Sequence, residues 1–180
     1  QGGSLPDWFN WNTGTPDLNK QGGFETAWFM FQTPVVSDNY VGMVSNQTNK
    51  EGLSQNLSSV IASGTNIYWT VWAASGKFFA STYNNEDTVT LEIYGNPYPN
   101  RTGNTNQAIP AGAVLLDEID ITSTEISSYI SAFTAPFDIA NISMSARWTT
   151  GESRAIMVDE FFMDESDSSI VCDADSDGIP

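Results

Sequence analysis

The chain has 180 residues, a length that suits one domain with a sizeable hydrophobic core. Its 22 acidic and six basic residues, with no histidine, give a formal net charge of −16 at pH 7. This charge argues against nucleic acid and against an anionic membrane as partners, because each of them requires a basic surface. No apolar run approaches the roughly 18 residues of a membrane span, so membrane insertion is not expected either.

The N-terminal segment combines turn-forming residues with aromatic ones. Trp8 and Trp11 lie in a loop rich in Asn, Thr and Pro, and Trp28 lies in a further aromatic cluster. These rings either fill the bottom of the core, the commoner case for tryptophan, or form a platform on which a ligand stacks. Asp17, which follows Pro16, either caps a turn or supplies an oxygen ligand.

Short runs with alternating or β-branched residues predict strands along the rest of the chain. The clearest run is Thr88 to Tyr94, in which Val89, Leu91 and Ile93 alternate with polar residues. We expect strands at residues 39–45, 51–57, 66–74, 88–94, 113–121, 139–148 and 154–164. A short helical turn is expected within Ser123 to Phe133. Many short strands without a sustained amphipathic helix predict an all-β antiparallel sandwich.

Two connections beside the strand at 88–94 are rich in polar residues. The first contains Asn84 and Asn85, and the second, residues 95–108, is long and rich in Asn, Gly and Pro. Long loops on a rigid sheet commonly carry recognition, so both connections are candidates for a binding site.

The closing strand, Arg154 to Asp164, has apolar residues on both faces. As a regular strand it places Ile156, Val158 and Phe162 on one face, and Met157, Phe161 and Met163 on the other. Glu160 interrupts the first face and Asp159 the second. A buried carboxylate needs a compensating charge, and calcium is the economical choice in a chain with few basic residues. Alternatively, both carboxylates lie at the exit of the strand and face water.

The last residues contain aspartates at alternate positions before a glycine. Asp173, Asp175 and Asp177 precede Gly178, a spacing that can place three oxygen ligands around one cation, as in the first half of an EF-hand loop. We therefore divide the chain into a sandwich domain, residues 1–167, and the start of an acidic calcium-repeat linker, residues 168–180. Because the motif stops at Pro180, we interpret the chain as a segment of a larger protein with neighbouring domains.

Three short motifs resemble those of galactose-binding-like jelly rolls found among carbohydrate-binding modules of secreted bacterial proteins. They are Gln21 to Glu25, Glu51 to Leu57, and Ile156 to Met163. The resemblance implies a jelly-roll sandwich whose structural calcium is held by Glu25 together with the acidic pair Asp159 and Glu160. Glu25 could instead simply face water beside its glycine turn. The tail is similar to thrombospondin type 3 calcium repeats, which are found in large surface proteins.

These observations predict a non-catalytic, calcium-dependent binding and adhesion module of an extracellular or surface protein, with carbohydrate as its ligand. The candidate residues are Trp8, Trp11 and Trp28 for stacking and Asp17, Asn84, Asn85 and Arg147 for hydrogen bonds. A domain that binds a peptide end through a surface calcium, and a spacer domain, are the alternatives. An enzyme is not expected, because there is no histidine to act as a base and no carboxylate pair is singled out by its spacing.

Overall fold

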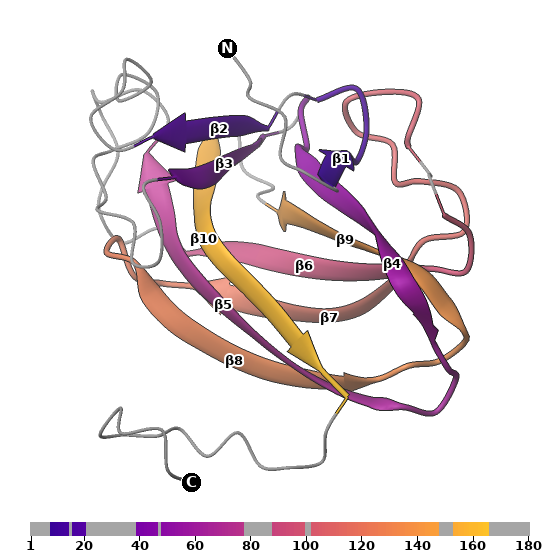
Figure 1. Ribbon diagram of the computed structural model, residues 1–180. Helices are drawn as coiled ribbons and strands as arrows, with labels where there is room; N and C mark the ends of the chain where they lie inside the picture. The colour runs from indigo at the N-terminus through magenta and orange to yellow at the C-terminus, as the bar shows by residue number, and fades with distance from the viewer. Residues whose placement is uncertain are drawn as a thin grey trace, which may run out of the picture.

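The computed structural model describes residues 8–14, 16–20, 39–46, 48–77, 88–99, 102–147 and 153–165. These residues form ten strands in two five-stranded antiparallel sheets, which pack face to face as a jelly-roll sandwich (Figure 1). Sheet A has the strand order β1-β4-β9-β6-β7, and sheet B has the order β2-β3-β10-β5-β8. The predicted all-β antiparallel sandwich is confirmed. Within the described ranges, no helix is long and apolar enough to cross a membrane.

The strand bounds agree with the sequence pattern at most positions. Sheet A consists of β1 (Trp8–Asn10), β4 (Gly52–Ile61), β6 (Val89–Asn96), β7 (Val114–Ile121) and β9 (Ile139–Arg147). Sheet B consists of β2 (Asp17–Lys20), β3 (Asn39–Ser45), β5 (Asn66–Lys77), β8 (Ser127–Thr134) and β10 (Arg154–Asp164).

The core lies between the two sheets and is built from alternating residues of each strand. Leu91 and Ile93 of β6 and Trp69 and Val71 of β5 belong to this core, and all four are fully buried. Because side chains alternate across a strand, the same pattern that fills the core sends the intervening residues of β6 to the outer face of sheet A. Each large apolar side chain that is fully buried contributes about 1.5–3 kcal/mol.

The helical turn expected within Ser123 to Phe133 is wrong for most of that segment, because residues 127–134 form strand β8. This strand pairs with β5 in a continuous antiparallel register from Ser127 to Thr134. Tyr129 and Phe133 turn toward the core while Ile130 is exposed, which is the two-residue period of a strand. Pairing with β5, which lies inside sheet B, outweighs the weak local preference of this segment for a helical turn.

The face assignment of the closing strand is also wrong, because β10 contains a β-bulge. Val158 pairs with Ala73 and Glu160 with Trp72, so that Asp159 is the extra residue. A bulge reverses the alternation. Ile156 and Val158 therefore face the core before it, and Phe161 and Met163 face the core after it. Phe162 is 57% exposed, and Glu160 is exposed as well, as in the alternative of a carboxylate that faces water.

Candidate binding site

The outer face of sheet A carries polar side chains in register across its strands. The strand pairing places Gly52, Ser145, Glu92 and Glu118 in one row, Ser54, Ser143, Tyr94 and Leu115 in the next, and Asn56, Asn141 and Asn96 in a third. We call these three rows the polar ladder. Most of these residues are buried, and so many buried polar side chains on one face are unusual. They indicate a surface whose side chains are already in place before a ligand binds.

Hydrogen bonds within and between strands hold the polar ladder in place. The Ser145 hydroxyl donates to the Glu51 carbonyl at 2.8 Å, and the Ser143 hydroxyl donates to the Asn141 side chain at 3.0 Å. Ser54 and Ser143 share a further short hydrogen bond. These side chains are buried and satisfied, so their geometry is fixed before any ligand arrives.

The long connection between β6 and β7 is attached to the rest of the molecule at several points. The Gly103 amide donates to the Trp11 carbonyl at 2.9 Å, and the Asn106 carbonyl accepts from the Lys50 amide at 2.8 Å and from the Asn12 side chain at 3.0 Å. A Cβ at Gly103 would lie 2.1 Å from the Ala108 carbonyl oxygen, so no other residue fits this turn without rearrangement. These contacts therefore hold the described part of this loop in a fixed position beside the polar ladder.

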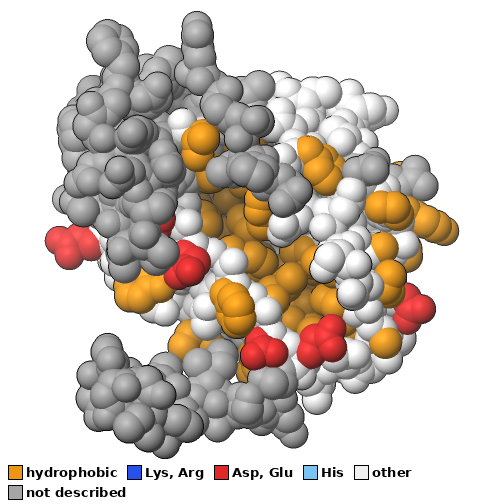
Figure 2. Space-filling view, in the orientation of Figure 1, with side chains coloured by type: hydrophobic (Ala, Val, Ile, Leu, Met, Phe, Trp, Pro, Cys, Tyr) orange, Lys and Arg blue, Asp and Glu red, His pale blue; other side chains and the backbone are white. Residues whose placement is uncertain are grey.

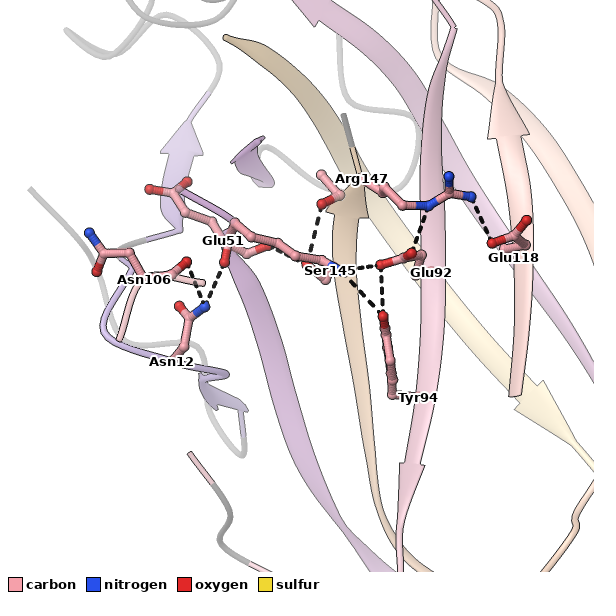
Figure 3. A network of polar contacts seen from close by, with 10 residues as sticks. Asn12, Glu51, Glu92, Tyr94, Asn106, Glu118, Ser145 and Arg147 are labelled. Atoms are coloured by element: carbon pink, nitrogen blue, oxygen red, sulfur yellow. Dashed lines mark hydrogen bonds and ion pairs between the residues drawn. The ribbon is translucent and has the colours of Figure 1, made fainter. Parts of the chain in front are cut away.

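A charged cluster forms the centre of the site (Figure 3). Glu92 is only 4% exposed, and its carboxylate accepts from Lys50 Nζ, from Arg147 Nε at 2.7 Å and from the Tyr94 hydroxyl at 3.0 Å. Arg147 also donates from Nη2 to Glu118 Oε2 at 2.7 Å. The buried carboxylate thus has two cations and one hydroxyl donor, which offset the cost of its desolvation.

The surroundings shift the pKa of two members of this cluster. Burial alone would lower the pKa of Arg147, but the carboxylates of Glu118 and Glu92 outweigh it and the pKa is raised. For Tyr94, burial raises the pKa of the phenol well above its usual value of 10, and the Glu92 carboxylate raises it further. Arg147 therefore stays charged, and the Tyr94 hydroxyl remains a hydrogen-bond donor.

We expect Tyr94→Phe to cost about 0.5–1.5 kcal/mol at pH 8, because one hydrogen bond to Glu92 is lost. The cost should shrink above pH 10. The folded-state pKa of Tyr94 is raised, so its stabilising contribution is complete below the unfolded-state pKa and is lost as the pH rises toward the folded-state value. Urea unfolding of both proteins at pH 8, 10 and 11 measures the difference. An equal difference at all three pH values would contradict the assignment.

Trp11 is fully buried and packs beside the polar ladder rather than in the core between the sheets. Its ring meets Tyr94 edge-on with the centroids 4.7 Å apart, and Lys50 Nζ lies 5.9 Å from its centroid. A Cβ at Gly52 would lie 2.6 Å from the Met144 carbonyl oxygen and 3.0 Å from Trp11 Cγ, so the ring requires glycine beneath it. Trp11 has no exposed face for a ligand in this arrangement.

The structure places the other predicted site residues separately. Trp8 is partly buried, packs against the core and meets Phe161 edge-on at 6.4 Å. Asp17 lies in β2, where its main chain pairs with Gly42 of β3. Among the predicted contact residues that the structure describes, Arg147 alone belongs to the charged cluster. The remaining predicted residues lie outside the described ones: Trp28, Asn84, Asn85, Glu25, Asp173, Asp175 and Asp177.

The described residues alone do not assemble the predicted calcium site. Asp159 is the partly buried extra residue of the bulge, whereas Glu160 is exposed. Within the part of the chain that the structure describes, no three acidic side chains converge on one point in a way that could hold a metal ion. Glu25, the third proposed ligand, lies outside that part, so the calcium site remains a prediction.

The exposed part of the outer face of sheet A, at and beside the polar ladder, offers both hydrogen-bonding groups and an apolar surface. The Arg147 side chain is 38% exposed and that of Glu118 is 49% exposed. Beside them the Thr90 hydroxyl donates to Asp120 Oδ1 at 2.8 Å, and Leu115 exposes its side chain further along β7. Such a surface can hydrogen-bond hydroxyl groups and contact the apolar face of a ring at the same time. We call Thr90, Leu115, Glu118, Asp120 and Arg147 the exposed strip.

Sequence comparison finds no match for this chain among family models or among curated proteins. Solved structures share its fold. A CBM4 structure matches with a TM-score of 0.51 and 13% identity, covering 89% of this chain and 96% of that one. The CBM22-1 xylan-binding domain of Paenibacillus barcinonensis Xyn10C matches with a TM-score of 0.52 and 9% identity, covering 91% and 87%.

A third structure has a second module in the same chain. The CBM22-1-GH10 modules of Clostridium thermocellum xylanase 10B, solved with xylohexaose, match with a TM-score of 0.53 and 11% identity. This chain spans 27% of that structure, whereas 91% of this chain is covered. At these identities the comparisons show the fold, which is that of carbohydrate-binding-module sandwiches.

Proposed function

We propose that this protein is a non-catalytic carbohydrate-binding module whose ligand lies on the exposed strip of sheet A. The observation that carries the proposal is the charged cluster on the prearranged polar ladder, in which Arg147 is held by Glu92 and Glu118 while more than a third of its side chain stays accessible. Fixed donors and acceptors beside an apolar side chain suit hydroxyl-rich ligands. The fold shared with CBM4 and CBM22 structures supports the same class of ligand.

The proposed ligand is an uncharged glycan. Arg147, the one cation of the strip, is already matched by carboxylates, since it contacts both Glu92 and Glu118. The net charge of −16 further disfavours sulfated or uronic-acid polysaccharides. An extracellular or cell-surface location and a role in adhesion are part of the proposal.

Binding of soluble neutral polysaccharides tests this proposal. We expect affinity electrophoresis in gels containing xylan or mixed-linkage β-glucan to retard the protein, and Arg147→Ala to weaken binding at least tenfold, because it removes a charged donor. Glu118→Ala combined with Asp120→Ala should weaken it about fivefold, through loss of hydrogen-bond acceptors on the strip. Glu125→Ala is the matched control, because Glu125 is an exposed carboxylate outside the strip.

Unchanged binding by the strip variants would contradict the proposed position of the ligand. If the Arg147, Glu118 and Asp120 variants bind a retained polysaccharide as tightly as the parent protein, the ligand lies elsewhere on the molecule. Repeating each gel with calcium and with excess chelator separately tests the calcium dependence predicted from the sequence, which we include in the proposal. A chelator that leaves both retardation and thermal unfolding unchanged would remove calcium from the proposal while keeping the glycan site.

A further inference from the structure

The outer face of sheet B carries an aromatic surface where β10, β5 and β8 lie side by side, on the far side of the sandwich from the exposed strip (Figure 1). The strand pairing places Phe162, Thr70 and Ile130 in one row. Trp72 and Tyr68 lie in the rows on either side of it, and Trp72 pairs with Glu160. The residues between them along β5 are buried in the core, so alternation directs these side chains outward. We call Tyr68, Thr70, Trp72, Ile130, Glu160 and Phe162 the outer patch of sheet B.

The side chains of the outer patch are accessible although most of them are apolar. Phe162 is 57% exposed and Ile130 is 45% exposed, and Tyr68 and Trp72 are partly exposed. Neither Tyr68 nor Trp72 packs against the buried clusters of the described chain. Among the described residues, Tyr68, Trp72 and Phe162 make no hydrogen bond and no ring contact. The patch therefore combines accessible ring faces with an indole N–H and a phenol hydroxyl that have no partner within the protein, as in surfaces that bind another molecule.

The exposure is confined to one half of the outer face of sheet B. At the other end of the same face, Ala74 pairs with Met157, and both are fully buried in a cluster that includes Tyr40 and Val44. The face changes from buried to exposed at the β-bulge of β10, because Glu160 is the first residue after the bulge. The outer patch is thus separate from both buried clusters.

The charge at the outer patch is negative. Glu160 is an exposed carboxylate without an ion pair or hydrogen bond among the described residues, and Glu165 is exposed directly after β10. Of the described basic side chains, Lys50 and Arg147 bind a buried carboxylate on sheet A, and Arg154 is buried. Figure 2 shows hydrophobic and acidic side chains next to one another where β5 and β10 lie, and no Lys or Arg among the described residues in view. A second copy of this chain would bring like charges together, so the charge favours a cationic partner instead.

We propose that the outer patch of sheet B binds an arginine-rich segment of a partner protein. A guanidinium group is planar, stacks on aromatic faces and donates N–H groups to a carboxylate. Trp72 and Glu160 are direct cross-strand partners, whose Cβ atoms lie about 5 Å apart, so one guanidinium can contact both the Trp72 ring and the Glu160 carboxylate. Phe162 and Ile130, in the next row, contact the aliphatic stem of the arginine. This proposal is independent of the glycan site.

The test uses three labelled synthetic peptides and fluorescence anisotropy at about 0.15 M salt, where the screening length is about 8 Å and long-range attraction is weak. The probe is Gly-Arg-Ser-Arg-Ser-Arg-Gly. The controls replace each arginine with lysine, which keeps the charge, or with citrulline, which keeps the shape and removes the charge. We expect the probe to bind at least threefold more tightly than the lysine peptide and at least tenfold more tightly than the citrulline peptide, because only arginine combines stacking with charge.

Matched variants separate the rings from the charge. Trp72→Ala combined with Phe162→Ala should weaken binding of the probe at least tenfold, whereas Ile109→Ala, an exposed apolar side chain between β6 and β7, should change it less than twofold. Glu160→Gln should weaken binding about fivefold, whereas Asp138→Asn, an exposed carboxylate between β8 and β9, should change it less than twofold. Thermal unfolding establishes that each variant is folded, and Glu160→Gln tests the patch without removing any packing.

Three results would overturn the proposal. They are equal binding of the arginine and lysine peptides, unchanged binding of the probe by the patch variants, and no binding at millimolar probe. Affinity electrophoresis in xylan gels tests whether the patch binds glycan instead. We expect the double variant of Trp72 and Phe162 to be retarded like the parent protein. Loss of retardation together with unchanged peptide binding would assign the patch to glycan and overturn the proposal.

Discussion

Replacing both Lys50 and Arg147 with methionine should destabilise the protein by about 3–5 kcal/mol, since it leaves a buried carboxylate without a cation. Glu92 is 4% exposed and both of its cationic partners are removed in this variant. The Tyr94 hydroxyl remains as a donor, but one neutral hydrogen bond does not replace two charged ones. Urea unfolding at pH 7 measures the change in the free energy of unfolding.

The single variants and a triple variant separate this explanation from simple loss of packing. Arg147→Met alone should cost only about 1 kcal/mol, because Arg147 is partly exposed and Lys50 still neutralises Glu92. Adding Glu92→Leu to the double variant should restore much of the lost stability, since well-packed apolar residues replace a buried ion pair at little cost. If the triple variant is no more stable than the double one, the buried charge is not the cause.

The strands of the core could be predicted because their two faces differ strongly in polarity. In β6, Val89, Leu91 and Ile93 alternate with polar residues, and the structure buries all three between the sheets. The bulge at Asp159 could not be predicted in this way. An acidic pair inside an apolar run fits either a regular strand or a bulge, and the choice depends on pairing with β5, which lies more than eighty residues earlier in the chain.

The candidate site was only partly accessible to sequence reasoning. The alternation of apolar and polar residues along β6 correctly places Glu92 on the outer face of sheet A. It does not show that this face is largely buried. Burial there depends on Trp11 and on the loop around Asn106, which are brought to the polar ladder by long-range hydrogen bonds. Lys50, Glu92 and Arg147 come from three strand regions far apart in the chain, so no local motif marks them. The alternation of Ser143, Ser145 and Arg147 with apolar residues shows only that these three side chains share one face of β9.

Trp69→Ala should cost about 3–5 kcal/mol of unfolding free energy, which is typical of removing a large buried aromatic side chain. Trp69 in β5 is fully buried, and its ring centroid lies 5.9 Å from that of Phe161. Its indole Nε1 donates to Asp117 Oδ2 of β7 at 2.8 Å, so the side chain connects sheet B to sheet A. Urea unfolding followed by far-ultraviolet circular dichroism avoids reliance on tryptophan emission.

A double-mutant cycle with Asp117 separates the hydrogen bond from the packing. Trp69→Phe keeps most of the apolar contact but removes the donor, and Asp117→Leu removes the acceptor. If the bond between the sheets matters, the two changes together should cost less than the sum of their separate costs by about 1–3 kcal/mol, as for hydrogen bonds to charged groups. Strict additivity would mean that the apolar contact alone holds Trp69. In that case the partly buried Asp117 carboxylate would be held by the Glu118 amide, which donates to its other oxygen at 2.9 Å.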